Sequence, residues 1–271
     1  MHSTARGEPH ARPHAICKKR HASSTQNACA PLRFGYTLFA PALSLFISLP
    51  GKADNQPLIL PRDFLPVGSL AQLSVCASPQ SGIKALPDLI ARAKERPGEI
   101  SFAATGIGRI THLTGLLLES RAGIKLQAVP YAGGPAAALT DVIGGRVPLI
   151  IEGYSGLAGA IQARSINVLA VASAHPLPDF PNVPTVAETL PGFDAGGWHD
   201  IVAPLGTPAA AIQKINASLR KVLGEAELAK QLALRGAYVD PMSPTEVNAF
   251  INAQQEQWRP ILEAFEASVR K

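Results

Sequence analysis

The sequence predicts an α/β protein in which a parallel sheet carries helices on both faces. Two observations predict this fold: short apolar strands alternate with amphipathic helices from residue 66 onward, and the 23 glycines and 24 prolines punctuate the chain between them. Strands and helices that alternate at this spacing are typical of parallel sheets. Frequent Gly and Pro exclude a long-helix or coiled-coil protein. The hydrophobic fraction of 46% is ordinary for a globular chain.

Each predicted strand is a short apolar run, and each predicted helix has apolar residues on one face and Gly or Pro near its end. The strands are expected at 67–75, 99–104, 126–131, 147–152 and 166–172, with helices between them. The C-terminal third is expected to be helical, at 208–223, 225–235 and from 243 to about 267. Ser243 and Glu246 have the spacing of a capping box at the start of the last helix. Ligands of parallel sheets bind at the carboxyl ends of the strands, so function is expected in the turns after Ala104, Tyr131 and Glu152.

The charge of the chain is concentrated at its start. Residues 1–33 contain six Lys and Arg against one Glu, and the other 238 residues balance at 19 basic and 19 acidic. A neutral body lacks the basic face that binding of nucleic acid requires, so no nucleic-acid partner is expected. Residues 1–33 also hold four of the seven histidines and no hydrophobic period, and they are predicted to be disordered.

The sequence shows no motif for metal binding or redox chemistry. The three cysteines form no C-x-x-C pair, and Cys76 stands in an apolar run where a small buried side chain is expected. The histidines of the first 33 residues have irregular spacing without a matching set of cysteines or carboxylates. No metal or cofactor is therefore expected.

The apolar segment at 34–50 has two interpretations. It is too short, and too interrupted by Pro41, to span a membrane as a helix. With basic residues before it and small residues after it, it mimics a signal peptide. It equally fits a buried strand and turn of the mature fold, and the local pattern alone does not decide between the two.

The turn after Ala104 contains two glycines and opens a helix, which is the geometry of an anion site. Backbone N–H groups and the helix dipole favour a small anion there, and a carboxylate is expected. Thr111 and His112 fall in the first helical turn and can add donors, while Arg109 can add a counter-charge or lie solvated. A dinucleotide is disfavoured because the third glycine of that motif is absent. Alternatively, the glycines only serve a tight turn. The candidate contacts here are Thr105, Gly106, Gly108, Arg109, Thr111 and His112.

Aromatic and hydroxyl side chains add further candidates. The segment 153–156 resembles the nucleophile elbow of a hydrolase, but its second glycine comes one residue early, so the pattern fails. Tyr154 and Ser155 are expected to give polar contacts to a ligand instead, together with Tyr131. Trp198 is either a core or hinge residue or part of the lining of a ligand cleft.

Taken in order, several short segments give the chain a family resemblance. It resembles the extracytoplasmic solute receptors of tripartite tricarboxylate transporters, the Bug receptors, over about residues 34–271. The matching segments are 35–38, 63–68, 95–103, 106–113, 129–136, 139–145, 181–188 and 203–208, with Trp198. Each segment is short, and their common order and spacing make the resemblance specific.

The resemblance implies a type II periplasmic binding protein, in which two α/β lobes close on a small carboxylate and deliver it to membrane transporter subunits. Residues 34–77 and 201–271 would form lobe 1, and residues 78–200 would form lobe 2. Gly106–His112 corresponds to the family loop that holds a ligand carboxylate, largely through backbone N–H groups. The implied protein is a periplasmic monomer that is not an enzyme.

The chain departs from the family pattern in two places. In the ligand loop it has Ile107 and Arg109 where the family usually has polar side chains, and Arg109 favours a more anionic ligand. Family members begin with a signal peptide, a strand and a Pro- and Gly-rich ligand loop, none of which residues 1–33 match. A truncated receptor with weak or no binding is therefore expected. The alternatives are a non-binding remnant or sensor module and, disfavoured because no acid–base constellation is present, an enzyme acting on a small carboxylic acid.

Overall fold

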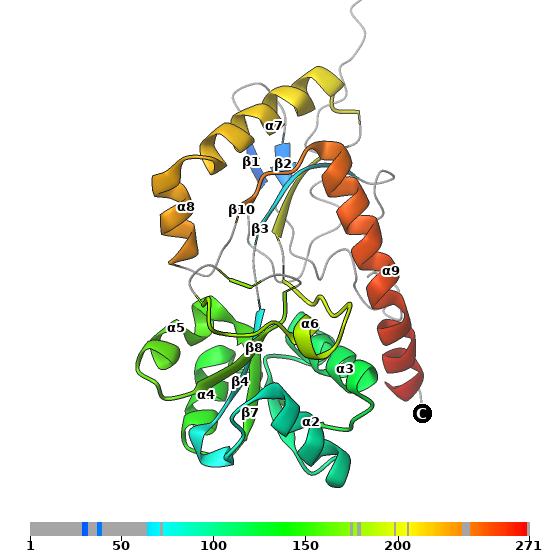
Figure 1. Cartoon of the computed structure of the whole chain (residues 1–271). Helices are drawn as coiled ribbons and strands as arrows, with labels where there is room; N and C mark the ends of the chain where they lie inside the picture. The colour runs from blue at the N-terminus through cyan, green and yellow to red at the C-terminus, as the bar shows by residue number, and fades with distance from the viewer. Residues whose placement is uncertain are drawn as a thin grey trace, which may run out of the picture.

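The computed structural model of the chain describes residues 29–31, 37–39, 64–70, 73–173, 176–177, 180–197, 199–204, 206–234 and 239–269. Its strands form two sheets of five strands each, flanked by helices (Figure 1). The strands are β1 (Cys29–Pro31), β2 (Thr37–Phe39), β3 (Phe64–Leu70), β4 (Leu73–Ala77), β5 (Ser101–Ala104), β6 (Gln127–Pro130), β7 (Leu149–Gly153), β8 (Asn167–Val171), β9 (His199–Pro204) and β10 (Val239–Asp240). The α-helices are α2 (Leu86–Glu95), α3 (Ile110–Ala122), α4 (Pro135–Ile143), α5 (Tyr154–Gln162), α6 (Val186–Thr189), α7 (Ala209–Leu223), α8 (Ala226–Ala233) and α9 (Pro244–Val269).

The first sheet, which we call sheet 1, has the order β1-β2-β9-β3-β10, and its described pairs are all antiparallel. Its central strands β3 and β9 pair from Phe64 opposite Pro204 to Leu70 opposite His199. The helices α7 and α9 contact β3. Sheet 1 and α7 form the upper part of the molecule in Figure 1, and α9 runs from there down toward α3.

The second sheet, sheet 2, has the order β6-β5-β7-β4-β8. The strands β6, β5 and β7 are parallel, and β4 runs antiparallel to both of its neighbours, β7 and β8. The prediction of an α/β sheet flanked by helices is confirmed, and the sheet is mixed rather than purely parallel. The reason is that β4 follows a strand of sheet 1 and is not joined to its neighbours by a β-α-β crossover, which is the connection that makes strands parallel.

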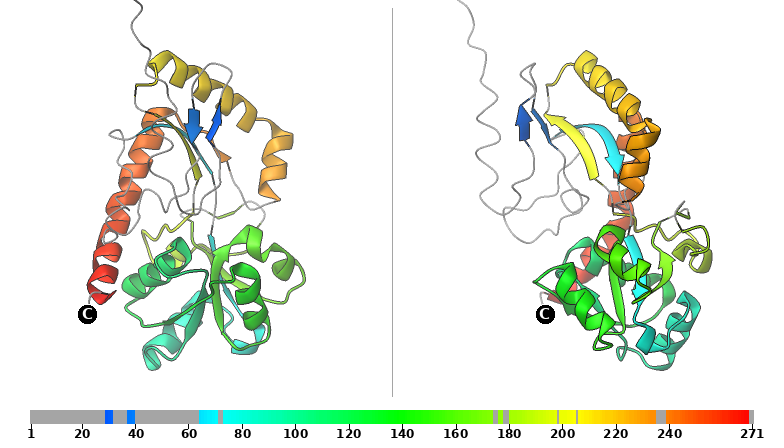
Figure 2. Two further views of the ribbon diagram at one scale, coloured as in Figure 1. Left: turned by 180° about the vertical axis from the view of Figure 1, so that it is seen from behind. Right: turned by 90° about the vertical axis from the view of Figure 1, so that its left-hand side faces the viewer.

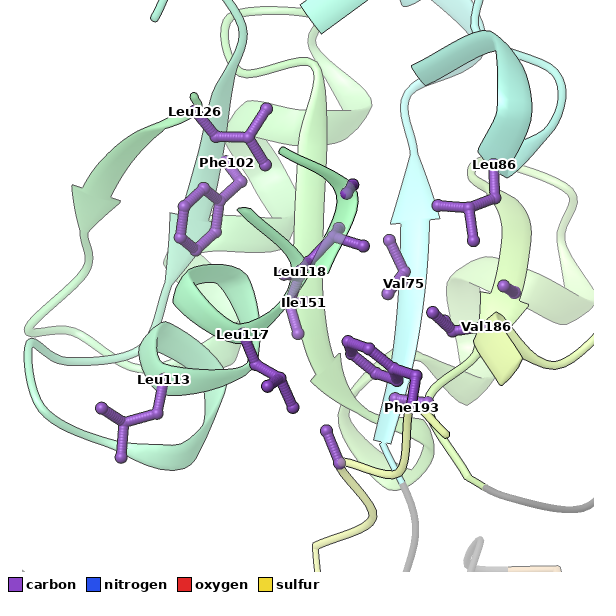
Figure 3. Packing of buried hydrophobic residues seen from close by; sticks show 14 of the residues in the cluster. Val75, Leu86, Phe102, Leu113, Leu117, Leu118, Leu126, Ile151, Val186 and Phe193 are labelled. Carbon is purple, nitrogen blue, oxygen red and sulfur yellow. The ribbon is translucent and has the colours of Figure 1, made fainter. Parts of the chain in front are cut away.

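The two faces of sheet 2 are covered by different helices because side chains alternate along each strand. One face packs against α2 and α3, and the other packs against α4 and α5. The first face contributes Val75, Ala77, Phe102, Ala104, Leu149 and Ile151, and the second contributes Cys76, Ala103 and Ile150. Figure 3 shows part of the first cluster, with Phe102, Leu118 and Ile151 between the strands and α3. Burial of Cys76, which is 0% exposed, confirms the expected small core side chain.

The two parts of the molecule meet where the chain passes from β3 to β4. Leu73, the first residue of β4, pairs with Gly153, the last residue of β7. The carboxyl edge of sheet 2 therefore faces the junction with sheet 1. A second link is α9, which contacts β3 at one end of the molecule and α3 at the other. Figure 2 shows α9 running alongside both parts.

Three expectations from the sequence are corrected or extended here. The strand expected at 67–75 is two strands, β3 and β4, which belong to different sheets. Cys29–Pro31 pair with Thr37–Phe39, so the prediction of disorder up to residue 33 is wrong for these three residues; residues 1–28, 32 and 33 lie outside the described part. Thr37–Phe39 form a strand of sheet 1, as the mature-fold interpretation of that segment requires. The proposed lobe boundaries stay a prediction.

Candidate functional site

The carboxyl ends of β5, β6 and β7 meet at one edge of sheet 2. Ala104 pairs with Pro130, and Phe102 pairs with Leu149, so the carboxyl ends of these three strands lie at the same edge, with β7 extending beyond the end of β5. The helices α3, α4 and α5 each begin just after one of these turns. The free N–H groups and positive dipole ends of three helices therefore lie at the same edge, which suits an anion.

The turn from β5 to α3, which we call the glycine loop, comprises Thr105–Arg109. Gly106 has a φ of +140° and Gly108 a φ of +74°, both in the region that favours glycine. A Cβ on Gly106 would lie only 2.8 Å from Cδ of Arg109, but this exposed side chain can move aside, so the requirement for glycine here is conformational. Arg109 is exposed and Ile107 is 51% exposed, so both side chains are accessible at the edge.

The first turn of α3 presents backbone donors to this edge. The N-cap residue Arg109 gives no side-chain capping bond. Within the described part of the chain, the N–H groups of Ile110, Thr111 and His112 have no acceptor. These donors and the glycine loop lie where the sequence predicts an anion site, and their contact with an anion stays a prediction.

Thr111 is buried and shapes the loop from within. Its Oγ1 accepts a hydrogen bond from the backbone N–H of Thr105 at 3.2 Å, and it lies 3.2 Å from the Oγ1 of Thr105. The sequence predicts Thr111 as a ligand donor, and the structure shows its hydroxyl engaged with the start of the glycine loop. Contact with a ligand by Thr105 and Thr111 stays a prediction.

His112 also points into the protein rather than to solvent, with 4% of its surface exposed. Its Nδ1 accepts a hydrogen bond from the backbone N–H of Gly108 at 3.2 Å. The ring stacks on Phe102 at a centroid distance of 6.4 Å and meets the edge of Phe265 from α9 at 5.2 Å. Burial lowers the pKa of His112. The ring is therefore held neutral, with its proton on Nε2.

Tyr131 follows β6 and its hydroxyl is already bonded. It donates to Oδ2 of Asp141 on α4 at 2.7 Å, and Asp141 also pairs with Arg146. Partial burial and the neighbouring carboxylate raise the pKa of Tyr131, while Arg146 and the Tyr131 hydroxyl lower the pKa of Asp141. This network fixes the turn that leads into α4.

The two candidate side chains that follow β7 differ in burial. Tyr154 is buried and meets the ring of Phe180 edge-on at 5.0 Å, whereas Ser155 is exposed on the first turn of α5. Trp198 lies outside the described residues. The structure thus brings the glycine loop, Tyr131, Tyr154 and Ser155 to one edge, and their contacts with a ligand stay a prediction.

Glu152 is a residue of this edge that the sequence analysis used only as the end of a strand. Its Oε1 accepts from the N–H of Gly153 at 2.8 Å, and its Oε2 is buried without a hydrogen-bond partner among the described residues. A Cβ on Gly156 would lie 3.3 Å from Cγ of Glu152 and 3.4 Å from Cβ of Pro135. The carboxylate thus lies between the first turns of α4 and α5. An acidic residue at the last position of an apolar strand is the signal that could have found it.

Two further searches covered the described residues. They contain no group of three or more His, Cys, Asp or Glu side chains placed to hold a metal ion. None of their helices is both long enough and apolar enough to cross a membrane.

The sequence and the fold both match one family. The family described as "Tripartite tricarboxylate transporter family receptor" matches residues 21–266. The protein BugT of Bordetella pertussis is 31% identical over 240 residues, which are 84% of this chain and 71% of BugT. A Pseudomonas protein from the tcbD-tcbE intergenic region is 33% identical over 205 residues, 74% of this chain. The match spans 61% of the length of that relative.

Solved structures give the same result for the fold. An R. palustris protein with adipate is 26% identical, with a TM-score of 0.72, and the match covers 86% of this chain and 78% of that one. The periplasmic binding protein BugD is 26% identical with a TM-score of 0.67, covering 84% of this chain and 78% of BugD.

Proposed function

This chain belongs to the tripartite tricarboxylate transporter receptor family, and on that premise we propose that it binds a small carboxylate and presents it to membrane transporter subunits. The observation that carries the proposal is the glycine loop at the N-terminus of α3. Its backbone conformation and the free N–H groups of Ile110 to His112 suit a carboxylate. A periplasmic location and a receptor role without turnover follow from the same family membership.

The described part of the edge suggests how charge is recognised. Backbone N–H groups and helix dipoles supply the attraction, and Arg109 is an exposed cation beside them. Ile107 adds an accessible apolar side chain, which suits a ligand with a short hydrocarbon chain. Because the similar R. palustris protein carries adipate, adipate is the first ligand to test.

Calorimetric titration of the full chain tests the proposal. Adipate and a panel of mono-, di- and tricarboxylates are compared with adipamide, which has the same carbon chain and no charge. We expect at least one acid to bind and the diamide not to bind, and a micromolar Kd would contradict the weak or absent binding that is expected from the sequence. Absence of binding across the panel would contradict the proposal and favour the non-binding remnant or sensor module. Conversion of a bound acid to a product would favour an enzyme instead.

Two glycine variants test the place of binding. Gly106→Ala is strained at φ +140° and brings Cβ to 2.8 Å from Arg109, so we expect binding to weaken about tenfold or more. Gly98→Ala is the matched control, because Gly98 also has positive φ, +81°, but has open space around it and lies before β5 at the opposite edge. Equal affinities of the two variants would place the ligand elsewhere.

A further inference from the structure

His112 lies where three elements of the molecule meet. Its own helix, α3, carries the first turn of the anion site, and β5 places Phe102 against one face of the ring. Phe265, from the last turns of α9, meets the ring at 5.2 Å with an interplanar angle of 74°. The ring is therefore clamped by side chains from distant parts of the sequence, and its rotation is restricted.

The clamped ring fixes the position of one atom of the glycine loop. The 3.2 Å hydrogen bond from the Gly108 N–H to Nδ1 is a side-chain contact that ties the middle of the loop to α3. Gly108 has no side chain and has a φ of +74°, so its own backbone preferences hold it weakly. An acceptor at this place selects one loop conformation from several that glycine allows.

We propose that His112 is a positioning residue of the ligand site, which acts on the ligand through Gly108 and the glycine loop rather than by touching it. This inference rests on the proposed function, because it assumes that the glycine loop holds the carboxylate. It changes the role that the sequence suggested, in which His112 donates a hydrogen bond directly.

The same contact makes carboxylate affinity depend on pH. A protonated imidazole carries a hydrogen on both nitrogens, so Nδ1 can no longer accept from Gly108. No charged neighbour contributes to the shift in the pKa of His112. Strand β5 has no charged residue, and the charged residues next in sequence to the packed positions are Arg109 in the loop and Glu266 on α9. Burial is the cause that lowers the pKa of His112. Affinity is therefore expected to fall at a pH below 6.5, as the pH drops through the lowered pKa of His112 in the folded protein.

Two substitutions separate the acceptor from the ring. His112→Phe keeps an aromatic ring between Phe102 and Phe265 but removes the acceptor. His112→Asn removes the ring but keeps an oxygen near the position of Nδ1. We expect His112→Phe to melt close to the wild-type temperature and to bind about tenfold more weakly. We expect His112→Asn to melt earlier and to recover most of that affinity.

The pH profile gives a readout that a purely structural role would not change. Between pH 7.5 and 5, the Kd of the wild type rises more steeply than that of His112→Phe, whose remaining slope reports protonation of the ligand itself. Wild-type affinity in His112→Phe, or equal slopes in the two proteins, would overturn the proposal. Leu89→Val, a core variant on α2 outside the site, is the control for stability. If it loses as much affinity as His112→Phe at the same loss of stability, the proposal is also overturned.

Hydrogen exchange without ligand separates this inference from the proposed function. Exchange at Gly108 is expected to accelerate in His112→Phe and to stay slow in His112→Asn. If no carboxylate binds the wild type, the proposed function fails, while the exchange rates still show whether His112 positions the loop. Unchanged exchange in His112→Phe would contradict the inference whatever the titrations show.

Discussion

Gly115 is expected to be intolerant of the smallest side chain, although it lies in a helix where alanine is normally preferred. A Cβ at this position would lie 2.3 Å from Cζ and 2.6 Å from Cε2 of Phe102. Phe102 is 0% exposed and belongs to the same cluster as Leu118 and Leu126 (Figure 3). Gly115→Ala therefore forces the ring to move inside a close-packed core.

Two opposing effects set the size of the change. Alanine favours the helix interior over glycine by about 1 kcal/mol. Overpacking a core costs about 1–3 kcal/mol, and more where the neighbour cannot move. Phe102 is constrained on its other side by His112, which stacks on it at 6.4 Å. We place the net loss at about 1–2 kcal/mol, which lowers the Tm by about 2–8 °C in a chain of this size.

Urea unfolding and calorimetry of matched variants measure this loss. Gly159→Ala is the control, because Gly159 also lies inside a helix but has no atom within 4 Å of the added Cβ; it is expected to gain about 0.5–1 kcal/mol. Combining Gly115→Ala with Phe102→Leu should cost less than the sum of the two single changes. A gain of stability in Gly115→Ala similar to that of Gly159→Ala would refute the reasoning.

Three further predictions concern buried titratable groups. Burial lowers the pKa of His112 in the folded protein. The neutral ring therefore contributes its full stability above about pH 6.5, and this contribution is lost as the pH falls through the pKa of the folded state. The Tm should fall between pH 7 and 5, and it should fall less in His112→Phe. Burial raises the pKa of Glu119 above its usual 4.5 while its Oε1 accepts from the Leu126 N–H at 2.8 Å. The ionised form therefore costs stability as pH rises above 4.5, and Glu119→Gln at pH 7 should be at least as stable as the wild type, whereas Glu119→Ala should lose about 1–3 kcal/mol. Cys76 is 0% exposed and its pKa is raised to about 12, so in a chain with both other cysteines replaced it should react with a thiol reagent only in denaturant; rapid reaction of the native protein would contradict its burial.

The ends of helices could be predicted from the sequence because their signals are local. The expected glycine near the end of a helix is found in α3, which ends at Ala122 and is followed by Gly123 at φ 62°. The capping box at 243–246 is also confirmed: the N–H of Ser243 donates to Oε2 of Glu246 at 2.7 Å, and the N–H of Glu246 donates to Oγ of Ser243 at 3.3 Å. In each case the residues that decide the structure lie within one helical turn of it.

The strands that connect the two sheets could not be predicted in the same way. Between Leu70 and Leu73 the sequence has no Gly or Pro to mark a turn, yet Leu70 pairs with His199 in one sheet and Leu73 pairs with Gly153 in the other. Local periodicity reports that a residue is buried, but it does not report which distant strand it pairs with. The antiparallel direction of β4 was missed for the same reason.

The candidate site shows a related limit, because recognition by backbone groups leaves little trace in side-chain chemistry. A backbone N–H comes from any residue except proline, so what the glycine loop needs from the sequence is geometry: positive φ at Gly106 and Gly108, and the acceptors that hold them. Thr111 and His112 are polar and fall in the first turn of α3, so sequence reasoning assigned them to the ligand. The structure turns both inward, with Thr111 on the Thr105 N–H and His112 on the Gly108 N–H. Since one clamp on His112 is Phe265 from α9, only the folded chain reveals that the shape of the loop depends on a residue near the other end of the sequence.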